Sequence, residues 1–220
     1  MTHTVRIIAI DNVTHDVKRI VAEKPEGYTF EPGQATEVAI NKEDFKDEKR
    51  PFTFTSLPED EHLELIVKMY EREGVTQKFD QLNTDDELII GDAWGSIRYK
   101  GPGYFIAGGA GVTPFIAILR KLEKDGKMEG NTLLYSNKEE RDIILEVELR
   151  QMLGLKFVNT LTQEKNEQYF HGRIDKKFLQ DHVKDFSKYF YVCGTMEMTE
   201  EVLKNLKELG VKEEQLVYEQ

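Results

Sequence analysis

Residues 104–114 read YFIAGGAGVTP, and this stretch decides the fold of the second half of the chain. Four apolar or aromatic residues predict a short buried strand, and the glycines after them predict a tight turn. A helix is expected over 113–124, because apolar side chains recur there at helical spacing. Small residues between a strand and a helix let an anion approach the amide groups of the helix N-terminus. The turn is therefore a candidate phosphate site, with a plain strand-to-helix connection as the alternative, and its candidate contacts are Gly109, Gly111, Thr113 and Pro114.

Strand and helix patterns continue to alternate after this stretch. Such alternation predicts a doubly wound parallel sheet with helices on both faces. Ligands of such sheets bind outside the carboxyl ends of the strands. Further strands are expected at 132–135, 156–160, 189–193 and 215–218, and further helices at 142–153, 175–182 and 196–209.

The residues before the stretch follow a different pattern. Short β-rich runs are separated by polar turns, and HLELIVK at 62–68 alternates as a half-buried strand should. This pattern predicts a small antiparallel barrel or sandwich, with one helix at 74–82. The sequence YKGPG at 99–103 marks a hinge, so we expect a first domain over 1–100 and a second over 101–220. The expected strands are 5–10, 17–21, 36–40, 52–55, 63–70 and 87–90.

Composition and charge narrow the class of protein. The 220 residues have a formal net charge of −11, which argues against nucleic acid or an anionic membrane as a partner. One cysteine cannot supply the ligands of an iron–sulfur cluster, and the five histidines show no metal-ligand spacing. No signal peptide is visible, so we expect a cytoplasmic protein, most simply a monomer, with no metal site.

Two segments of the first half carry candidate binding residues. Arg50 precedes a strand, where its guanidinium could fork onto a pyrophosphate, and Phe52 lies on the same side of that strand. An exposed arginine and a core phenylalanine are the alternative. At 74–76 a glycine and a hydroxyl meet the start of the expected helix, either as a second anion site or as an ordinary N-cap. The candidates are Arg50, Phe52, Thr53, Gly74, Val75 and Thr76.

The single cysteine, Cys193, follows the expected strand 189–193 and precedes Gly194. It would lie at the carboxyl end of the strand, beside the expected ligand cleft. The sequence ties no histidine to Cys193 as a base, which argues against a nucleophilic role. A buried thiol that acts as a small apolar side chain is the alternative.

These segments together, in this order, resemble the motifs of the ferredoxin–NADP reductase superfamily, in particular its short bacterial flavodoxin or ferredoxin reductase-like members. Three other segments add to the resemblance: PGQ at 32–34, GRI at 172–174, and GDAWG at 91–95, where Asp92 replaces the usual proline of a GPxG segment. The resemblance covers about residues 30–219. It implies a flavin-binding β-barrel followed by a nicotinamide-nucleotide domain.

The resemblance also implies cofactors and roles. FAD, with FMN the less favoured choice, would bind the barrel, and NADPH or NADH would deliver hydride to flavin N5. Arg50 would pair with the flavin pyrophosphate, Phe52 would lie against the flavin ring, and Thr53 would hydrogen-bond near N5. Cys193 would orient the nicotinamide, Glu219 would relay a proton, and Trp94 or Tyr218 would cover the second flavin face. The other implied contacts are Val67, Lys68, Met69, Gly74, Val75 and Thr76 for the flavin, and Gly109, Gly111, Thr113, Pro114, Ser136, Lys138, Gly194 and Met196 for the nucleotide.

The loop SNKEER at 136–141 should lie beside the adenosine ribose. A 2′-phosphate favours cations there, and a free 2′-hydroxyl favours a carboxylate. Because the loop offers both, we expect weak discrimination between NADPH and NADH, with Ser136 and Lys138 as the 2′-phosphate contacts.

The resemblance implies that electrons leave to a separate small carrier, a flavodoxin or ferredoxin, because one cysteine leaves no fused iron–sulfur domain. Such carriers are acidic, so a local basic patch would be needed, formed by Lys46, Lys49, Lys68, Arg72 and Lys78. A reductase of free flavin or ferric chelates is the nearest alternative. A non-catalytic flavin- or nucleotide-binding subunit of a larger complex is another.

Overall fold

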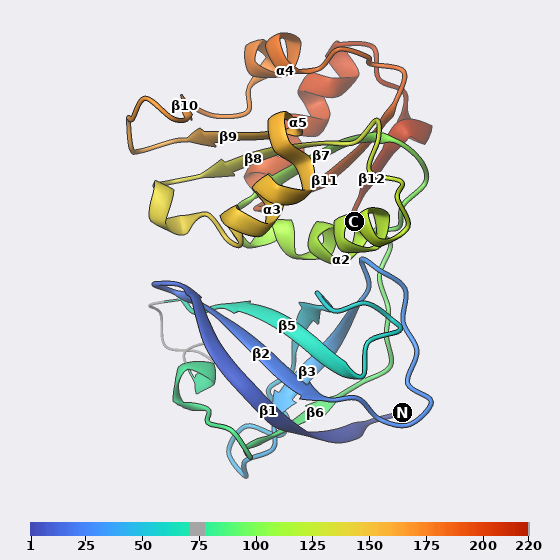
Figure 1. The fold of residues 1–220 in the computed structure, drawn as a ribbon, viewed down its shortest axis with the longest axis vertical. Coiled ribbons are helices and arrows are strands. Elements are labelled where there is room, and N and C mark those ends of the chain that lie inside the picture. The colour runs from blue at the N-terminus through green and yellow to red at the C-terminus, as the bar shows by residue number, and fades with distance from the viewer. Residues whose placement is uncertain (71–77, 220) are drawn as a thin grey trace.

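The computed structural model describes residues 1–70 and 78–219, which form two six-stranded sheets. Figure 1 shows the first sheet in the lower half of the molecule and the second in the upper half. The first half carries the N-terminus and the second half the C-terminal helices. None of the helices in the described part of the chain is both long and apolar enough to cross a membrane.

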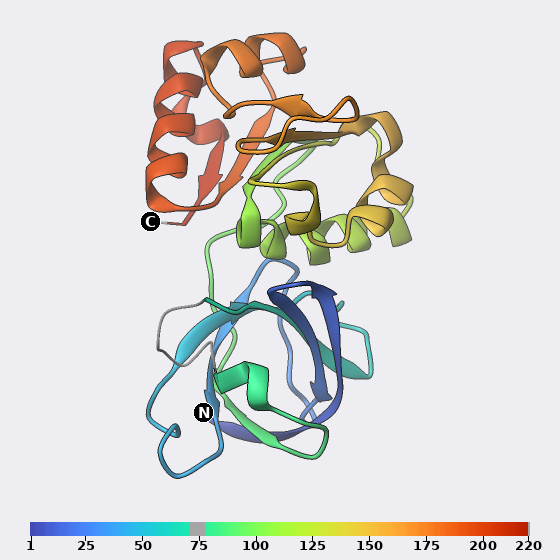
Figure 2. The same cartoon turned by 90° about the vertical axis from the view of Figure 1, so that its left-hand side faces the viewer.

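The first sheet is antiparallel and has the strand order β4-β3-β6-β1-β2-β5. A bridge between Phe54 and Leu65 joins its two edges, so the sheet curls into a barrel (Figure 2). Inward-facing apolar side chains such as Val5, Ile7 and Leu88 fill the interior. The strands are β1 (His3–Thr14), β2 (Val17–Glu23), β3 (Ala35–Ile40), β4 (Arg50–Thr53), β5 (His62–Lys68) and β6 (Glu87–Ile90).

The second sheet is parallel and has the order β10-β9-β8-β7-β11-β12. Chain order runs one way from β7 and the other way from β11, so these neighbours form the switch point at which ligands bind in such folds. The strands are β7 (Gly103–Gly108), β8 (Thr132–Asn137), β9 (Phe157–Leu161), β10 (Phe170–His171), β11 (Tyr189–Cys193) and β12 (Leu216–Tyr218). The helices are α2 (Thr113–Lys124), α3 (Glu146–Leu153), α4 (Lys176–His182) and α5 (Met196–Glu208).

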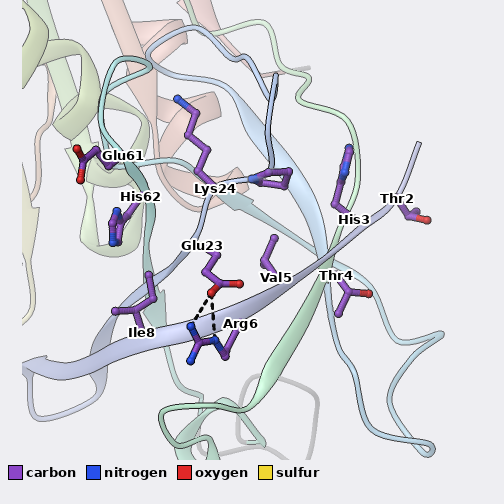
Figure 3. A pocket seen from close by; sticks show the side chains of 11 residues that line it. Thr2, His3, Thr4, Val5, Arg6, Ile8, Glu23, Lys24, Glu61 and His62 are labelled. Carbon is purple, nitrogen blue, oxygen red and sulfur yellow. Dashed lines mark hydrogen bonds and ion pairs between the residues drawn. The ribbon is translucent and has the colours of Figure 1, made fainter.

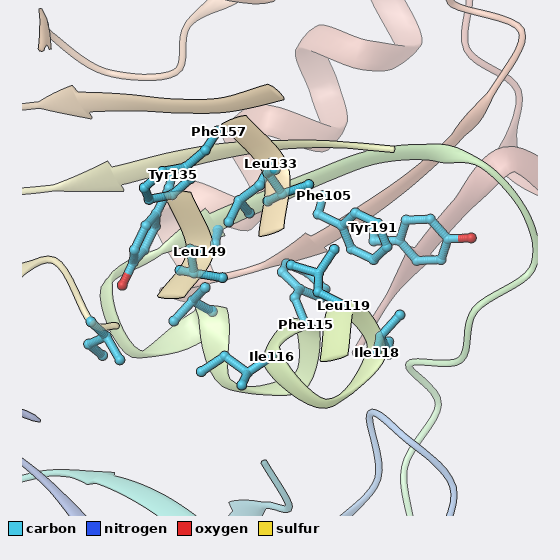
Figure 4. Close-up of a cluster of buried hydrophobic side chains, with 14 of the residues drawn as sticks. Phe105, Phe115, Ile116, Ile118, Leu119, Leu133, Tyr135, Leu149, Phe157 and Tyr191 are labelled. Atoms are coloured by element: carbon cyan, nitrogen blue, oxygen red, sulfur yellow. The ribbon is translucent and has the colours of Figure 1, made fainter. Parts of the chain in front are cut away.

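Both faces of the parallel sheet are covered, as the alternation predicts. Helices α2 and α3 cover one face, where Phe105 and Tyr191 stack with ring centroids 4.4 Å apart (Figure 4). Helices α4 and α5 cover the other, with Leu179 and Leu206 fully buried. The predicted doubly wound sheet is confirmed.

Three details differ from the sequence prediction. Helix α3 begins at Glu146 rather than at 142, because Leu145 takes a left-handed conformation with φ of 52°. The two-residue strand β10 is too short to leave a sequence pattern. The first four residues of the helix expected over 74–82 lie outside the described residues, and the described part holds a short 3₁₀ turn, Phe79–Gln81.

Helix α2 lies between the parallel sheet and the barrel (Figure 1). Its Phe115 and Ile118 belong to one buried cluster with Val17 of β2 and Ile66 of β5. A side chain on Gly33 of the barrel would lie 3.1 Å from Ile118 Cδ1. The two halves therefore share an apolar interface, which fixes the helix that follows the glycine turn against the barrel.

Candidate active site

The glycine turn lies at the switch point. Strand β7 ends at Gly108, residues 109–112 form one 3₁₀ turn, and α2 starts at Thr113. A side chain on Gly111 would collide with the carbonyl oxygen of Cys193, at the end of β11. Gly111 is thus required for the turn after β7 to contact the turn after β11.

These turns form the floor of a cleft of about 970 Å³ between the two halves of the chain. The barrel contributes Pro51, Lys68 and Tyr70 to its lining, and the carboxyl end of β8 contributes Ser136 and Lys138. A cleft at a switch point, bordered by a second domain, has room for a nucleotide cofactor. The predicted residues that line it are Lys68, Gly109, Gly111, Ser136, Lys138, Gly194 and Glu219.

The predicted phosphate contacts of Thr113 and Pro114 stay predictions, because the two residues lie next to the cleft rather than in its lining. Pro114 is buried in the first turn of α2, and neither residue lines the cleft. The Thr113 hydroxyl donates to the carbonyl oxygen of Ala110 at 3.0 Å. Both residues support the turn on the side away from the cleft. A nucleotide in the cleft would face the backbone of the glycines.

Cys193 is the last residue of β11; its neighbour Gly194 lines the cleft, whereas Cys193 is not among the lining residues. Burial, and then the negative charge of Glu219, raise the pKa of the Cys193 thiol to about 12. The thiol therefore stays neutral at ordinary pH, which agrees with the absence of a nucleophilic role. Desolvation also raises the pKa of the Glu219 carboxyl, which lines the same cleft.

Met198 is a cleft residue that the sequence analysis missed. Side chains built on Gly108 and Gly194 would both meet its sulfur, at 2.8 Å for Gly194. Its thioether therefore occupies the notch that the two glycines leave. The predicted Met196, by contrast, is 78% exposed and does not line the cleft. Helical periodicity from the N-cap Thr195 places Met198, not Met196, over the glycines.

The predicted flavin residues of the barrel lie on adjacent strands. Arg50 on β4 is exposed, pairs with no carboxylate of the described residues, and donates to the carbonyl oxygen of Lys49 at 2.7 Å. Phe52 is half-buried and meets Phe79 edge-on, with ring centroids 5.1 Å apart. Thr53 ends the same strand and is also half-buried. Arg50 and Phe52 thus place a cation, which no carboxylate of residues 1–70 and 78–219 pairs, and an aromatic ring at one edge of the barrel.

Strand β5 supplies the next predicted contacts. Val67 is fully buried in the barrel, so only its backbone could meet a ligand. Lys68 pairs with Asp16 at 2.8 Å, and the Met69 amide donates to the Asp16 carbonyl. The predicted contacts Gly74, Val75 and Thr76 lie outside the described residues, as does Arg72 of the predicted basic patch.

The structure brings together one group that sequence spacing does not reveal. The possible ligand atoms of His15, Asp16 and Asp142 lie within 4.8 Å of one another, across the two halves of the chain. The Lys68 ammonium already forms an ion pair with the Asp16 carboxylate, at 2.8 Å. This group therefore acts as a polar contact between the halves.

A separate hollow on the outside of the barrel holds none of the predicted residues (Figure 3). Its Arg6 pairs with Glu23 at 2.7 Å and with Asp85 at 3.0 Å. Its Lys24 donates to the carbonyl oxygens of Pro58 and Asp60. Both cations are thus occupied, so this hollow is a poor anion site.

Comparison with known families agrees with this geometry. A sequence model of an FAD-binding domain matches residues 2–102, and one of the oxidoreductase NAD-binding domain matches residues 105–204. The chain belongs to the ferredoxin–NADP reductase-like superfamily. This is a superfamily of NAD(P)H-dependent flavoprotein oxidoreductases, and the expected fold and cofactor classes are confirmed.

Similar proteins of the superfamily include reductase components. The ferredoxin–NAD(P)⁺ reductase component of the naphthalene 1,2-dioxygenase system of Pseudomonas putida is 25% identical over 98% of this chain and 69% of its own length. The reductase component of propane 2-monooxygenase from Rhodococcus jostii is 25% identical over 97% of this chain. NADH-cytochrome b5 reductase 1 of Kluyveromyces lactis is 35% identical over 47% of this chain. The chain spans 62% and 40% of these last two proteins.

Solved structures share the whole fold. A ferredoxin–NADP⁺ reductase from Neisseria gonorrhoeae, with bound FAD and NADP, superposes with a TM-score of 0.86, 18% identity and coverage of 99% of this chain and 98% of that one. The FAD/NAD-binding domain of a nitric oxide dioxygenase from Vibrio cholerae superposes with a TM-score of 0.86 and 20% identity. The match covers 98% of this chain and 97% of that one. At these identities the likeness shows the fold alone.

The residues present fit the two cofactors of the superfamily. Gly109, Gly111 and Gly194 line the cleft, and the space beside the Gly109 α-carbon is open, so the backbone of the turn is accessible there. The exposed Arg50 guanidinium lies two residues from the half-buried Phe52 ring on β4. A bare backbone turn suits a nucleotide phosphate, and a cation beside an aromatic ring suits a flavin pyrophosphate and ring.

Proposed function

We propose that this superfamily member is a reductase that takes hydride from NADPH or NADH and passes electrons to a separate small carrier protein, a flavodoxin or ferredoxin. The observation that carries the proposal is that the glycine turn of the second half and Lys68 and Tyr70 of the barrel line the same cleft. A bound flavin would accept two electrons as hydride and release them one at a time. The domain limits 1–100 and 101–220 and a cytoplasmic location belong to the same proposal.

The barrel residues would hold the flavin. Arg50 would pair with its pyrophosphate, since no carboxylate of the described residues competes for this guanidinium. Phe52 would pack against the flavin ring, supported from behind by Phe79. Thr53 would offer a hydrogen bond near the reactive nitrogen, and the backbone of Val67, Lys68 and Met69 would line the ring edge.

The second half would hold the nicotinamide nucleotide. The backbone at Gly109 and Gly111 would face its phosphates, and Gly194 would allow close approach at the end of β11. Cys193 would orient the nicotinamide as a neutral thiol. Glu219, whose raised pKa favours a carboxyl that can hold a proton, would relay it to solvent.

The preference for NADPH or NADH would be weak. Lys138 lines the cleft and pairs with no carboxylate of residues 1–70 and 78–219, so it could meet a 2′-phosphate together with Ser136. Arg141 is already paired with Glu139 at 2.7 Å. Asn137 also lines the cleft, but its amide side chain is neutral, so it brings no charge there.

The reductase components among the relatives support a separate protein acceptor. Of the expected basic patch, Lys46, Lys49 and Lys78 have no carboxylate partner in the described part of the chain, whereas Lys68 is paired with Asp16. Direct reduction of free flavin or ferric chelates is the second candidate, because the cleft is open to solvent at Tyr70, which is 55% exposed.

Steady-state assays with NADH and NADPH decide between these acceptors. We expect kcat/KM for a one-electron carrier protein to exceed that for free FMN or a ferric chelate by at least about tenfold. Equal or greater efficiency with the small acceptors would favour the second candidate. Bound flavin that neither nucleotide reduces would favour a non-catalytic subunit.

A further inference from the structure

One arginine of helix α2 joins the two halves of the chain. Arg120 lies two helical turns after the glycine turn, and its side chain is only 20% exposed. Its Nε and Nη2 donate to the two carboxylate oxygens of Glu148 on α3, at 2.6 and 3.0 Å. Its Nη1 donates across the interface to the barrel, to Glu64 Oε1 at 2.6 Å and to the carbonyl oxygen of Thr55 at 2.7 Å.

The barrel side of this contact is itself held in place. Glu64 is 14% exposed on β5, and the Thr55 hydroxyl donates to its Oε1 at 2.7 Å. The Thr55 amide donates to the Glu64 carbonyl at 2.9 Å. Arg19 of β2 lies 3.9 Å from the other carboxylate oxygen. The Arg120 guanidinium therefore binds an acceptor that other hydrogen bonds hold in place. An ion pair between mobile surface side chains has no such fixed acceptor.

The segments that Arg120 joins carry the proposed cofactor contacts. Thr55 lies two residues after Thr53, and Glu64 lies on the strand that ends in Val67 and Lys68. On the other side, α2 begins at Thr113, two residues after Gly111. A rigid helix and two short strand segments thus connect the proposed flavin site to the proposed nucleotide site through one planar side chain.

We propose that Arg120 is a positioning residue that sets the alignment of the nucleotide half on the flavin half, and through it the rate of hydride transfer. This inference rests on the proposed function. A guanidinium binds in a fixed plane, so its four hydrogen bonds fix direction as well as distance. The rate of hydride transfer depends strongly on the positions of the reacting atoms, and a displacement of about 1 Å can lower it about 10²-fold.

Other contacts across the interface hold the two halves together but do not fix their relative orientation. Lys121 and Lys124 of α2 reach Glu59 at 3.2 and 3.0 Å, but these side chains are 37–52% exposed. Apolar packing of Ile118 against the barrel has no preferred direction. Loss of Arg120 should therefore loosen the alignment while the halves remain in contact.

The test compares Arg120→Met and Arg120→Lys with Arg150→Met. Arg150 is a matched control, because it pairs with Glu146 within α3 and is 51% exposed. Anaerobic stopped-flow mixing of flavin-loaded protein with NADH or NADPH gives the limiting reduction rate and the apparent Kd. For Arg120→Met we expect the limiting rate to fall by at least about tenfold. The apparent Kd and the flavin content should stay within about twofold.

Arg120→Lys keeps the positive charge but loses the planar group that donates to Glu148 and the barrel at once. Its limiting rate should therefore lie between those of the parent and Arg120→Met. If Arg120→Met does not fold, Arg120→Lys alone tests the proposal, and its limiting reduction rate should fall by at least about threefold. Arg150→Met should match the parent. A limiting rate within twofold of the parent in every folded Arg120 variant would overturn the proposal.

A second measurement needs no bound cofactor. Spin labels on Leu155→Cys in the second half and Glu61→Cys in the barrel, both at exposed positions, report the distance between the halves in a Cys193→Ser background. Arg120→Met should broaden the distance distribution, and Arg150→Met should leave it unchanged. A distribution that stays narrow in Arg120→Met would overturn the inference. A broadened distribution, together with a parent protein whose bound flavin neither nucleotide reduces, would keep the alignment role and reject the proposed function.

Discussion

Gly111 and the carbonyl oxygen of Cys193 approach so closely that no side chain fits between them. Gly111 follows β7 and Cys193 ends β11, and these neighbouring strands are the ones at which the chain order of the sheet reverses. This contact shapes the floor of the cleft. It also explains why a glycine is needed at this point of the turn, which the backbone angles of Gly111 alone do not require.

Gly111→Ala should weaken nucleotide binding and leave the flavin in place. The new methyl group would meet the Cys193 carbonyl and lie 2.7 Å from the Gly194 amide nitrogen, so the two turns must separate. We expect the apparent Kd for NADH or NADPH to rise by at least about tenfold, a loss of about 1.4 kcal/mol. The matched control is Gly91→Ala, whose methyl would lie 3.6 Å from its nearest neighbour. Equal effects of the two substitutions would show that the contact with Cys193 plays no part.

Arg50→Ala should purify with little flavin. Loss of a hydrogen bond to a charged group costs about 1.5–3 kcal/mol, which corresponds to at least about tenfold in affinity. The measurement is a fluorescence titration of the flavin-free protein with FAD and with FMN. Arg98→Ala is the control, because Arg98 is a similarly exposed arginine that pairs with Glu31 of the barrel at 3.3 Å. Unchanged FAD affinity in Arg50→Ala would remove Arg50 from the flavin site.

Cys193→Ala should slow flavin reduction by up to about 10²-fold while flavin content stays normal, because the nicotinamide would lose a group that positions it. A reduction rate within twofold of the parent would leave Cys193 with a packing role only.

The raised thiol pKa makes a separate prediction about pH. The thiolate is the reactive form, and with a pKa of about 12 only about one thiol in 10⁴ is ionised at pH 8. Alkylation of the folded protein by iodoacetamide should be slow at pH 8 and should rise steadily to beyond pH 10. A titration midpoint near the ordinary value of about 8.5 would contradict the burial of this thiol.

Part of the site could be predicted from the sequence because its chemistry is local. The glycines of the β7 turn and the Cys193-Gly194 pair each lie directly after an apolar strand, so the rule for parallel sheets places them at one edge. Thr113 and Pro114 follow the same turn but do not line the cleft: Pro114 is buried in α2, and the half-buried Thr113 bonds to the turn itself.

The rest depends on contacts between segments far apart in the chain. Met198 fills a notch between glycines from two strands, and Arg120 binds a carboxylate 56 residues away. Neither contact leaves a pattern in the local sequence. The same holds for the group of His15, Asp16 and Asp142, which only the packing of the two halves brings together.

Lys138→Ala tests the choice of nucleotide. Because Lys138 is the cation that lines the cleft beside Ser136, its loss should lower the ratio of kcat/KM for NADPH over NADH by about threefold to tenfold. The parent should prefer neither nucleotide by more than about 10³-fold, a difference of about 4 kcal/mol. Lys165→Ala, on the following loop, is a control outside the cleft lining. An unchanged ratio in Lys138→Ala would exclude Lys138 from the choice.

The most direct test of the central claim is an anaerobic titration of the purified, flavin-loaded protein with NADH or NADPH, followed by the flavin absorbance. If the two halves form one reductase site, about one equivalent of nucleotide should bleach the bound flavin, and an oxidised one-electron carrier should restore the colour. A flavin that stays oxidised in the presence of excess NADH and NADPH would contradict the account.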